Sequence, residues 1–166
     1  MGAWHGVAAG LATVIMGGCL TASTFAAPAD YDPPTPVAVW IAPEFSPADR
    51  ADIEHTLDVW NTALNGYLRF RVTSVPLDVV VRPARSRANY LGLTVAGSVE
   101  LFPGWSPMVA LHEFGHVLGL PDDDRHLSTL MGTPVENSVP CVDELTLDEL
   151  AQAKGWDKGR LRPTCL

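Results

Sequence analysis

His112, Glu113 and His116, in the segment HEFGH, are the residues of this chain whose types and spacing best suit chemistry. On an α-helix, residues four apart lie on one face, so His112 and His116 would project side by side. Two neutral imidazoles held that way form a chelating pair for a divalent metal ion, most often zinc. Glu113 lies roughly 100° further round the helix, where its carboxylate is suited to act as general base on a water at the metal. The alternative interpretation is structural: the two histidines would be hydrogen-bonded polar groups on a half-buried helix, with no metal ion.

The flanking residues predict the helix that would carry this pair. Ser106 is a good N-cap, and Pro107 suits the first helical position. Gly119 can adopt the left-handed conformation that ends a helix, and Pro121 prevents its continuation. The turn predicted here sends the chain back toward the metal, and Asp122 is the next residue that could ligate it.

The third ligand has two candidates, Asp122 and His126. Asp122 is favoured because its spacing from the histidines is the one that the helix-ending glycine sets up. If the loop runs differently, His126 takes the role instead. The neighbouring Asp123 and Asp124 are also open to interpretation as a solvated acidic loop or a weak calcium site.

The segment HEFGHVLGLPD, followed nine residues later by the methionine of STLMG, resembles the metzincin metalloproteases. With an aspartate at the position of the third ligand, the chain resembles the small secreted bacterial proteases called snapalysins. The segment LSTLMGTP resembles the methionine turn of the matrixins. The resemblance implies zinc bound by His112, His116 and Asp122, with Glu113 as the base and Met131 beneath the metal. It also implies a zinc endopeptidase that acts on protein or peptide substrates.

The predicted elements describe an α/β (α+β) domain over residues 30–166, and the resemblance implies that it is a metzincin-like zincin domain. A twisted mixed sheet of four or five strands would be backed by two helices, one of them carrying the site, with a third, C-terminal helix after the methionine turn. The first strand is expected to begin at Val37 (VAVWIA), and the others to span Leu68–Thr73, Leu77–Val81, Tyr90–Val95 and Ser98–Phe102. One helix is expected to begin at Ser46-Pro47 and end at Asn65-Gly66. The last helix is LTLDELAQA, capped by Thr146 with Glu149 completing a capping box. By the resemblance, Tyr90–Thr94 is the edge strand that pairs with the substrate chain.

Composition and the N-terminus predict an exported protein. The chain has 166 residues and a net charge of −8, and an acidic body argues against nucleic-acid binding. Residues 1–29 contain no Asp, Glu, Lys or Arg and are predicted to be a secretory signal peptide, with a lipid anchor on Cys19 as the alternative. Cleavage would leave Cys141 and Cys165, which we expect to form a disulfide in an oxidising compartment. We expect a monomer with no stable membrane association.

Two other functions stay open at this stage. The same scaffold would also serve hydrolysis of a non-peptide amide, or a catalytically silent protein. The presence of Glu113 beside His112 and His116 argues against a silent scaffold, because a purely structural site has no need of that carboxylate. A calcium requirement, in addition to zinc, is also open.

Overall fold

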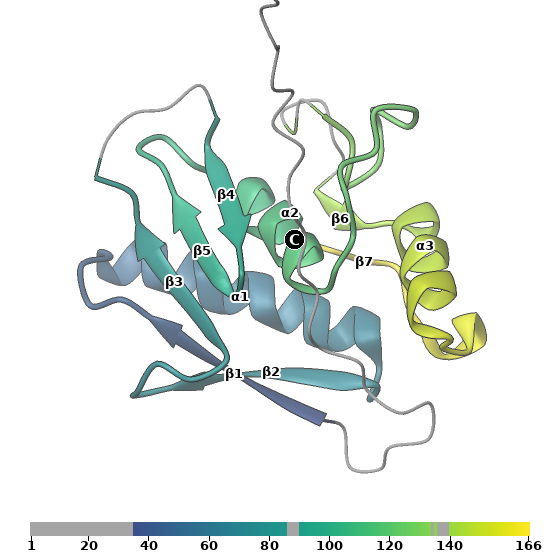
Figure 1. Ribbon diagram of the computed structural model, residues 1–166, viewed down its shortest axis with the longest axis horizontal. Helices are drawn as coiled ribbons and strands as arrows, with labels where there is room; N and C mark the ends of the chain where they lie inside the picture. The colour runs from purple at the N-terminus through teal and green to yellow at the C-terminus, as the bar shows by residue number, and fades with distance from the viewer. Residues whose placement is uncertain (1–34, 86–89, 134, 136–139) are drawn as a thin grey trace, which may run out of the picture.

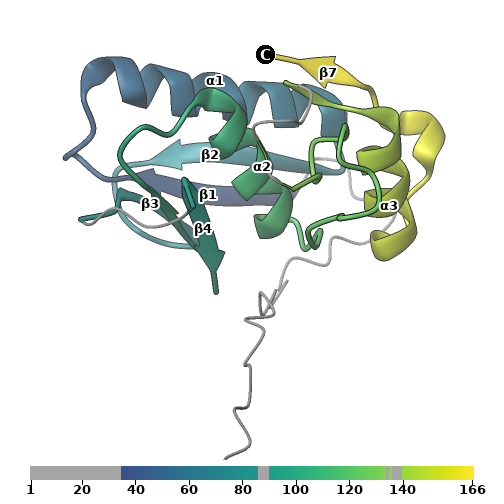
Figure 2. The same cartoon turned by 90° about the horizontal axis from the view of Figure 1, so that it is seen from above.

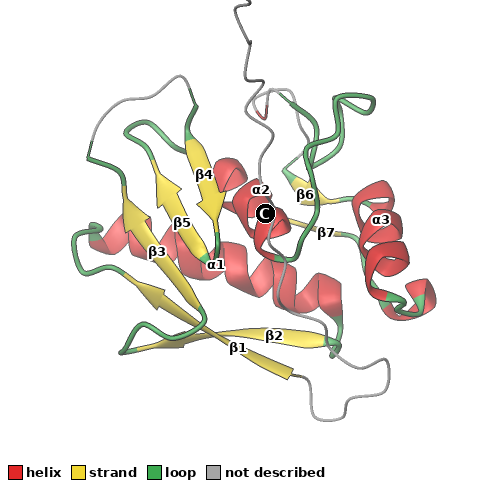
Figure 3. Ribbon diagram, viewed as in Figure 1, coloured by secondary structure: helices red, strands yellow, loops and turns green. Residues whose placement is uncertain are grey.

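Five strands form one mixed sheet in the order β2-β1-β3-β5-β4. The computed structural model describes residues 35–85, 90–133, 135 and 140–166; the predicted signal peptide and Cys19 lie outside these residues. The sheet strands are β1 (Thr35–Ile41), β2 (Leu68–Thr73), β3 (Val79–Pro83), β4 (Gly92–Val95) and β5 (Ser98–Leu101). The helices are α1 (Pro47–Leu64), α2 (Pro107–Val117) and α3 (Glu144–Lys154), and Lys158–Arg160 forms a short 3-10 turn. The predicted fold class is confirmed (Figures 1 and 3).

The sheet is parallel except at one edge. β1 pairs in parallel with β2 and β3, β3 pairs in parallel with β5, and β4 alone is antiparallel to its neighbour β5. β4 is therefore an edge strand, as predicted for Tyr90–Thr94, although its ladder begins at Gly92 and its antiparallel direction was not predicted. Three other strands differ from their predicted bounds: β1 begins at Thr35, β3 runs Val79–Pro83, and β5 ends at Leu101. These ends depend on pairing partners, which local sequence does not show.

Helix α1 covers one face of the sheet and supports α2 (Figure 2). Its N-terminus is the predicted one: Ser46 accepts a hydrogen bond from the Asp49 backbone N–H, and the Asp49 carboxylate bonds back to Ser46. Asn65, in the left-handed conformation, ends the helix. The buried indole N–H of Trp60 donates to the carbonyl of Leu111 at 2.9 Å, which ties α1 directly to the helix that carries the candidate site.

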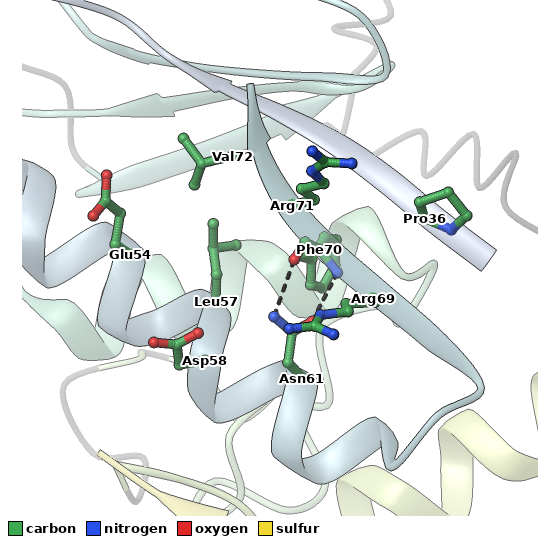
Figure 4. A pocket seen from close by; sticks show the side chains of 9 residues that line it. All are labelled: Pro36, Glu54, Leu57, Asp58, Asn61, Arg69, Phe70, Arg71 and Val72. Carbon is green, nitrogen blue, oxygen red and sulfur yellow. Dashed lines mark hydrogen bonds between the residues drawn. The ribbon is translucent and has the colours of Figure 1, made fainter. Parts of the chain in front are cut away.

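The opposite edge of the sheet, at β2, is hollowed into a groove of about 680 Å³ (Figure 4). There the Asn61 side-chain amide bonds both backbone groups of Phe70, donating to its carbonyl and accepting from its N–H. The amide thus takes the place of a neighbouring strand along part of β2. None of the predicted site residues lines this groove.

The C-terminal part of the chain is fastened to the body by a disulfide. Cys141 and Cys165 are bonded, as predicted, and lie opposite each other in a two-stranded ladder of β6 (Cys141–Val142) and β7 (Thr164–Cys165). The predicted cap of the last helix was wrong: α3 begins at Glu144, and Asp143, not Thr146, is its N-cap. Asp143 caps the helix because its carboxylate accepts hydrogen bonds from both the backbone N–H and the hydroxyl of Thr146, which places Thr146 inside the first turn.

Within the part of the chain that the structure describes, no helix has the length and apolar character needed to span a bilayer.

Candidate metal centre

Helix α2 buries the predicted metal-binding pair in the middle of the domain. Ser106 occupies the N-cap position and Pro107 the first turn, as predicted, but the Ser106 side chain makes no capping hydrogen bond. Trp60 on α1 and the strands β4 and β5 pack against the helix. His112 and His116 are about 5% and 7% exposed, so their ring nitrogens are desolvated groups that require partners.

The end of α2 orients His116. Gly119 takes a positive φ of 93°, and the backbone N–H groups of Gly119 and Leu120 donate back to the carbonyls of His116 and Gly115. This double hydrogen bond is the Schellman arrangement that reverses the chain after a helix. It places the Leu120 carbonyl 2.8 Å from His116 Nδ1, which donates its proton there. Because Nδ1 carries the proton, the lone pair of the neutral ring lies on Nε2.

The segment around Met131 orients His112 in the same way. His112 Nδ1 donates to the carbonyl of Leu130 at 2.8 Å, while the Leu130 N–H donates to the Asp143 carboxylate at 2.8 Å. Met131 is fully buried beneath the helix, where its sulfur occupies the space left by the missing side chain of Gly115. A Cβ at Gly115 would lie 2.4 Å from the Met131 sulfur.

Asp122 points toward the two histidines. Its Oδ1 lies 3.2 Å from His112 Nε2 and 3.4 Å from His116 Nε2, so one carboxylate oxygen and two ring nitrogens converge on a common point. The structure therefore brings together the three residues predicted as ligands.

The charges of this cluster are matched only when a positive charge is shared among the three groups. Two neutral rings would present lone pairs toward an anionic oxygen, which is repulsive. Hydrogen bonds from His112 and then His116 hold the pKa of Asp122 well below its usual value. Burial alone would lower the pKa of His116, but the contact with Asp122 and the charge of Glu113 raise it overall. The site thus favours a cation, either protons on the rings or a metal ion.

Glu113 is buried on the neighbouring side of α2, under the edge strand. Thr94 of β4 donates a hydrogen bond from its hydroxyl to Glu113 Oε2 at 2.7 Å. Burial raises the pKa of Glu113, against the lowering effects of His116 and of this hydrogen bond. Ligand atoms of Glu113, His112 and His116 lie within 4.8 Å of one another, so the carboxylate is close to the point on which the rings converge.

His126, the alternative third ligand, has a different partner. Its Nδ1 lies 2.5 Å from Oδ2 of the buried Asp123, whose other oxygen accepts from the backbone N–H and the Nε of Arg125. Ligand atoms of Asp123, His126 and Glu149 also lie within 4.8 Å of one another. We interpret them as a charge network rather than a metal site, because the Arg125 guanidinium already lies between Asp123 and Glu149.

Several residues that shape this centre have no signal in the sequence. Thr94 and Gly92 contact Glu113 across a sequence separation that only the fold closes. Asp143 and the Leu130 carbonyl act through backbone hydrogen bonds, which leave no pattern of residue types. Gly115 is the exception, because a glycine inside the predicted helix of the HEFGH motif is a signal of close approach that the sequence does carry.

No protein-family model matches the chain, and no match is found among the curated proteins. Among solved structures, the chain is similar to high choriolytic enzyme 1, a hatching enzyme zinc-protease of the medaka fish Oryzias latipes, with 24% sequence identity and a TM-score of 0.40. The match covers 52% of this chain and 44% of that chain, so this chain spans less than half of the length of that protein.

Proposed function

We propose that this protein is a zinc-dependent endopeptidase. The observation that carries the proposal is the convergence of His112 Nε2 and His116 Nε2, both on buried rings, with Oδ1 of the partly exposed Asp122, in a cluster whose charges favour a cation. The donor set, two imidazoles and a carboxylate, is typical of catalytic zinc sites, which keep a fourth position open.

The spacing of these atoms fits zinc. With metal–ligand bonds of about 2.0–2.1 Å, two ligands at tetrahedral positions lie about 3.3 Å apart. The separations of 3.2 and 3.4 Å from Asp122 Oδ1 to the two ring nitrogens agree with that value. The carbonyls of Leu130 and Leu120 hold both rings in the tautomer that turns a lone pair inward.

In the proposed mechanism, Glu113 moves the proton. When bound, zinc would polarise the scissile carbonyl and make the attacking water more acidic. The Glu113 carboxylate accepts a proton from that water as its oxygen attacks the carbonyl carbon, and then delivers the proton to the leaving amine nitrogen. Burial of Glu113 supports this role, because a carboxylate with a raised pKa is a stronger base.

The substrate is proposed to be an extended polypeptide laid along β4. β4 is the edge strand beside α2, and a substrate chain could pair with it by main-chain hydrogen bonds. The Phe102 N–H donates to the Leu91 carbonyl. Since an antiparallel ladder alternates, the backbone of Gly92 is then turned toward the open edge. Pairing of this kind binds many sequences, so we expect broad protein substrates.

We further propose that residues 1–29 direct export and that residues 30–166 form the secreted catalytic domain, acting as a monomer. The disulfide between Cys141 and Cys165 supports an oxidising compartment.

The test is hydrolysis of casein by the purified secreted chain, measured together with zinc content. We expect one zinc per chain, loss of hydrolysis with a chelator, and recovery with added zinc. Glu113→Gln should retain zinc and lose activity by about 10²–10⁴-fold. Glu54→Gln, which changes a partly exposed glutamate of α1 that pairs with Arg50, is the matched control and should behave as the wild type. Full zinc occupancy without cleavage of any protein or peptide would sink the proposal and favour a silent or non-peptide-hydrolysing protein.

A further inference from the structure

The carboxylate of Glu113 is enclosed by the edge strand as well as by its own helix. Thr94 lies in β4 and is about 7% exposed, and its hydroxyl lies 2.7 Å from Glu113 Oε2 and 3.1 Å from the Glu113 carbonyl oxygen. A hydrogen bond to a carboxylate in a dry environment is stronger and more directional than one in water. One oxygen of the carboxylate therefore has a fixed donor.

Gly92 lies against the other oxygen. It is two residues from Thr94, so both positions face the same side of the strand, toward α2. A Cβ at Gly92 would lie 2.3 Å from Glu113 Oε1 and 2.6–2.7 Å from its Cγ and Cδ. Atoms cannot approach so closely, and the exposed fraction of Glu113 is only about 5%, so a side chain at this position would displace the carboxylate.

We infer that Thr94 and Gly92 are positioning residues for Glu113, and that they decide which carboxylate oxygen takes the proton. Thr94 occupies Oε2, and the missing side chain at Gly92 leaves room for Oε1. Oε1 is thus the oxygen that accepts the proton from the attacking water. The inference rests on the proposed function.

The same strand would then serve two tasks. The backbone of Gly92 is turned toward the edge along which the substrate is proposed to pair, while its Cα lies against the base. A substrate strand paired with β4 would therefore lie next to Glu113 Oε1, the oxygen that takes the proton from the attacking water. Displacing the Glu113 carboxylate should therefore change kcat more than KM, since the base acts in the chemical step and not in substrate binding.

The experiment compares Thr94→Val, which keeps the shape and removes the hydroxyl, with Thr94→Ser, which keeps the hydroxyl. We expect kcat for a peptide substrate to fall roughly 10–100-fold in Thr94→Val with KM within about twofold of the wild type. Thr94→Ser should restore most of kcat, and zinc content should be unchanged in both. Thr73→Val, the same change in a strand at the opposite edge, is the matched control and should leave kcat unaltered.

A second measurement does not depend on activity. In a double-mutant cycle followed by thermal unfolding, Thr94→Val should lower the Tm of the wild type more than that of Glu113→Ala, because the hydrogen bond to the carboxylate is already lost there. Gly92→Ala should lower kcat as well, by displacing Oε1.

The outcomes separate the two proposals. An inactive wild-type chain that binds zinc contradicts the endopeptidase assignment. The double-mutant cycle would still measure the hydrogen bond between Thr94 and Glu113, because it does not depend on activity. An active wild type in which Thr94→Val keeps its kcat, or in which Thr94→Ser is as slow as Thr94→Val, overturns the positioning role. Additive Tm changes in the cycle overturn it too.

Discussion

Replacing Gly115 by alanine should disturb the proposed metal site through Met131, although Gly→Ala inside a helix normally stabilises the helix. The added methyl would lie 2.4 Å from the Met131 sulfur and 3.1 Å from its terminal carbon. Carbon atoms in ordinary contact are about 3.5–4.0 Å apart, so the methionine must move by about 1 Å or more. Met131 is fully buried, so its side chain cannot move out into solvent without disturbing its neighbours.

The expected cost follows from two opposed effects. Overpacking a dense core costs about 1–3 kcal/mol, whereas alanine in place of glycine in a helix contributes about 0.5–1 kcal/mol of stability. The net loss is about 0–2.5 kcal/mol, which lowers the Tm by up to roughly 10 °C at about 2–4 °C per kcal/mol. Because the Leu130 carbonyl beside Met131 orients His112, zinc affinity should also fall about 10–100-fold.

The assay is thermal unfolding of the chain with and without Met131→Ala, alongside zinc titration against a competing chelator. With the methionine truncated, Gly115→Ala should become neutral or stabilising, since only the helix effect remains. A higher Tm for Gly115→Ala in the wild-type background would refute the close contact between the helix and the methionine.

Three further outcomes are expected. Asp143→Ala removes the cap of α3 and the acceptor of the Leu130 N–H, so it should cost about 2 kcal/mol in chemical unfolding and weaken zinc binding. Cys141→Ser opens the loop closed by the bond to Cys165, with a sequence separation of 24, and should cost about 3 kcal/mol; reductant should no longer alter the stability of that variant. Asp123, whose pKa is lowered from its usual 3.8 to about 2 by His126, then by the neighbouring Arg125, stabilises the fold above pH 4 and loses that contribution as the pH falls toward 2. Asp123→Asn should therefore be about 2 kcal/mol less stable at pH 7, and equally large losses at pH 7 and pH 2 would contradict this.

The sequence predicts those parts of the molecule whose causes are local. Ser46, Asp49 and Asn65 bound α1 through contacts within a few residues, and both ends were predicted. Gly119 predicted the turn that aims Asp122, because the hydrogen bonds of that turn involve only neighbouring residues. Where two acceptors competed locally, at Asp143 and Thr146, the position of the cap was wrong.

The rest depends on long-range contacts. Thr94 was placed in a strand, but the target of its hydroxyl depends on how β4 lies over α2, which no local pattern records. His126 and Asp122 were both possible ligands in sequence. In the folded chain, the buried carboxylate of Asp123 pairs with His126, and Asp122 lies at the histidines. The Asp123 N–H donates to the carbonyl of Met131. The burial of Asp123 therefore depends on how the loop folds back onto the Met131 segment, which local sequence does not show.

The central claim is tested most directly by X-ray diffraction from crystals of the zinc-loaded chain at wavelengths on either side of the zinc absorption edge. We expect one strong anomalous peak about 2.0–2.2 Å from His112 Nε2, His116 Nε2 and a carboxylate oxygen of Asp122, with the peak retained in His126→Ala. A peak bound by His126, or zinc-saturated crystals with no peak between the two rings of α2, would contradict the account.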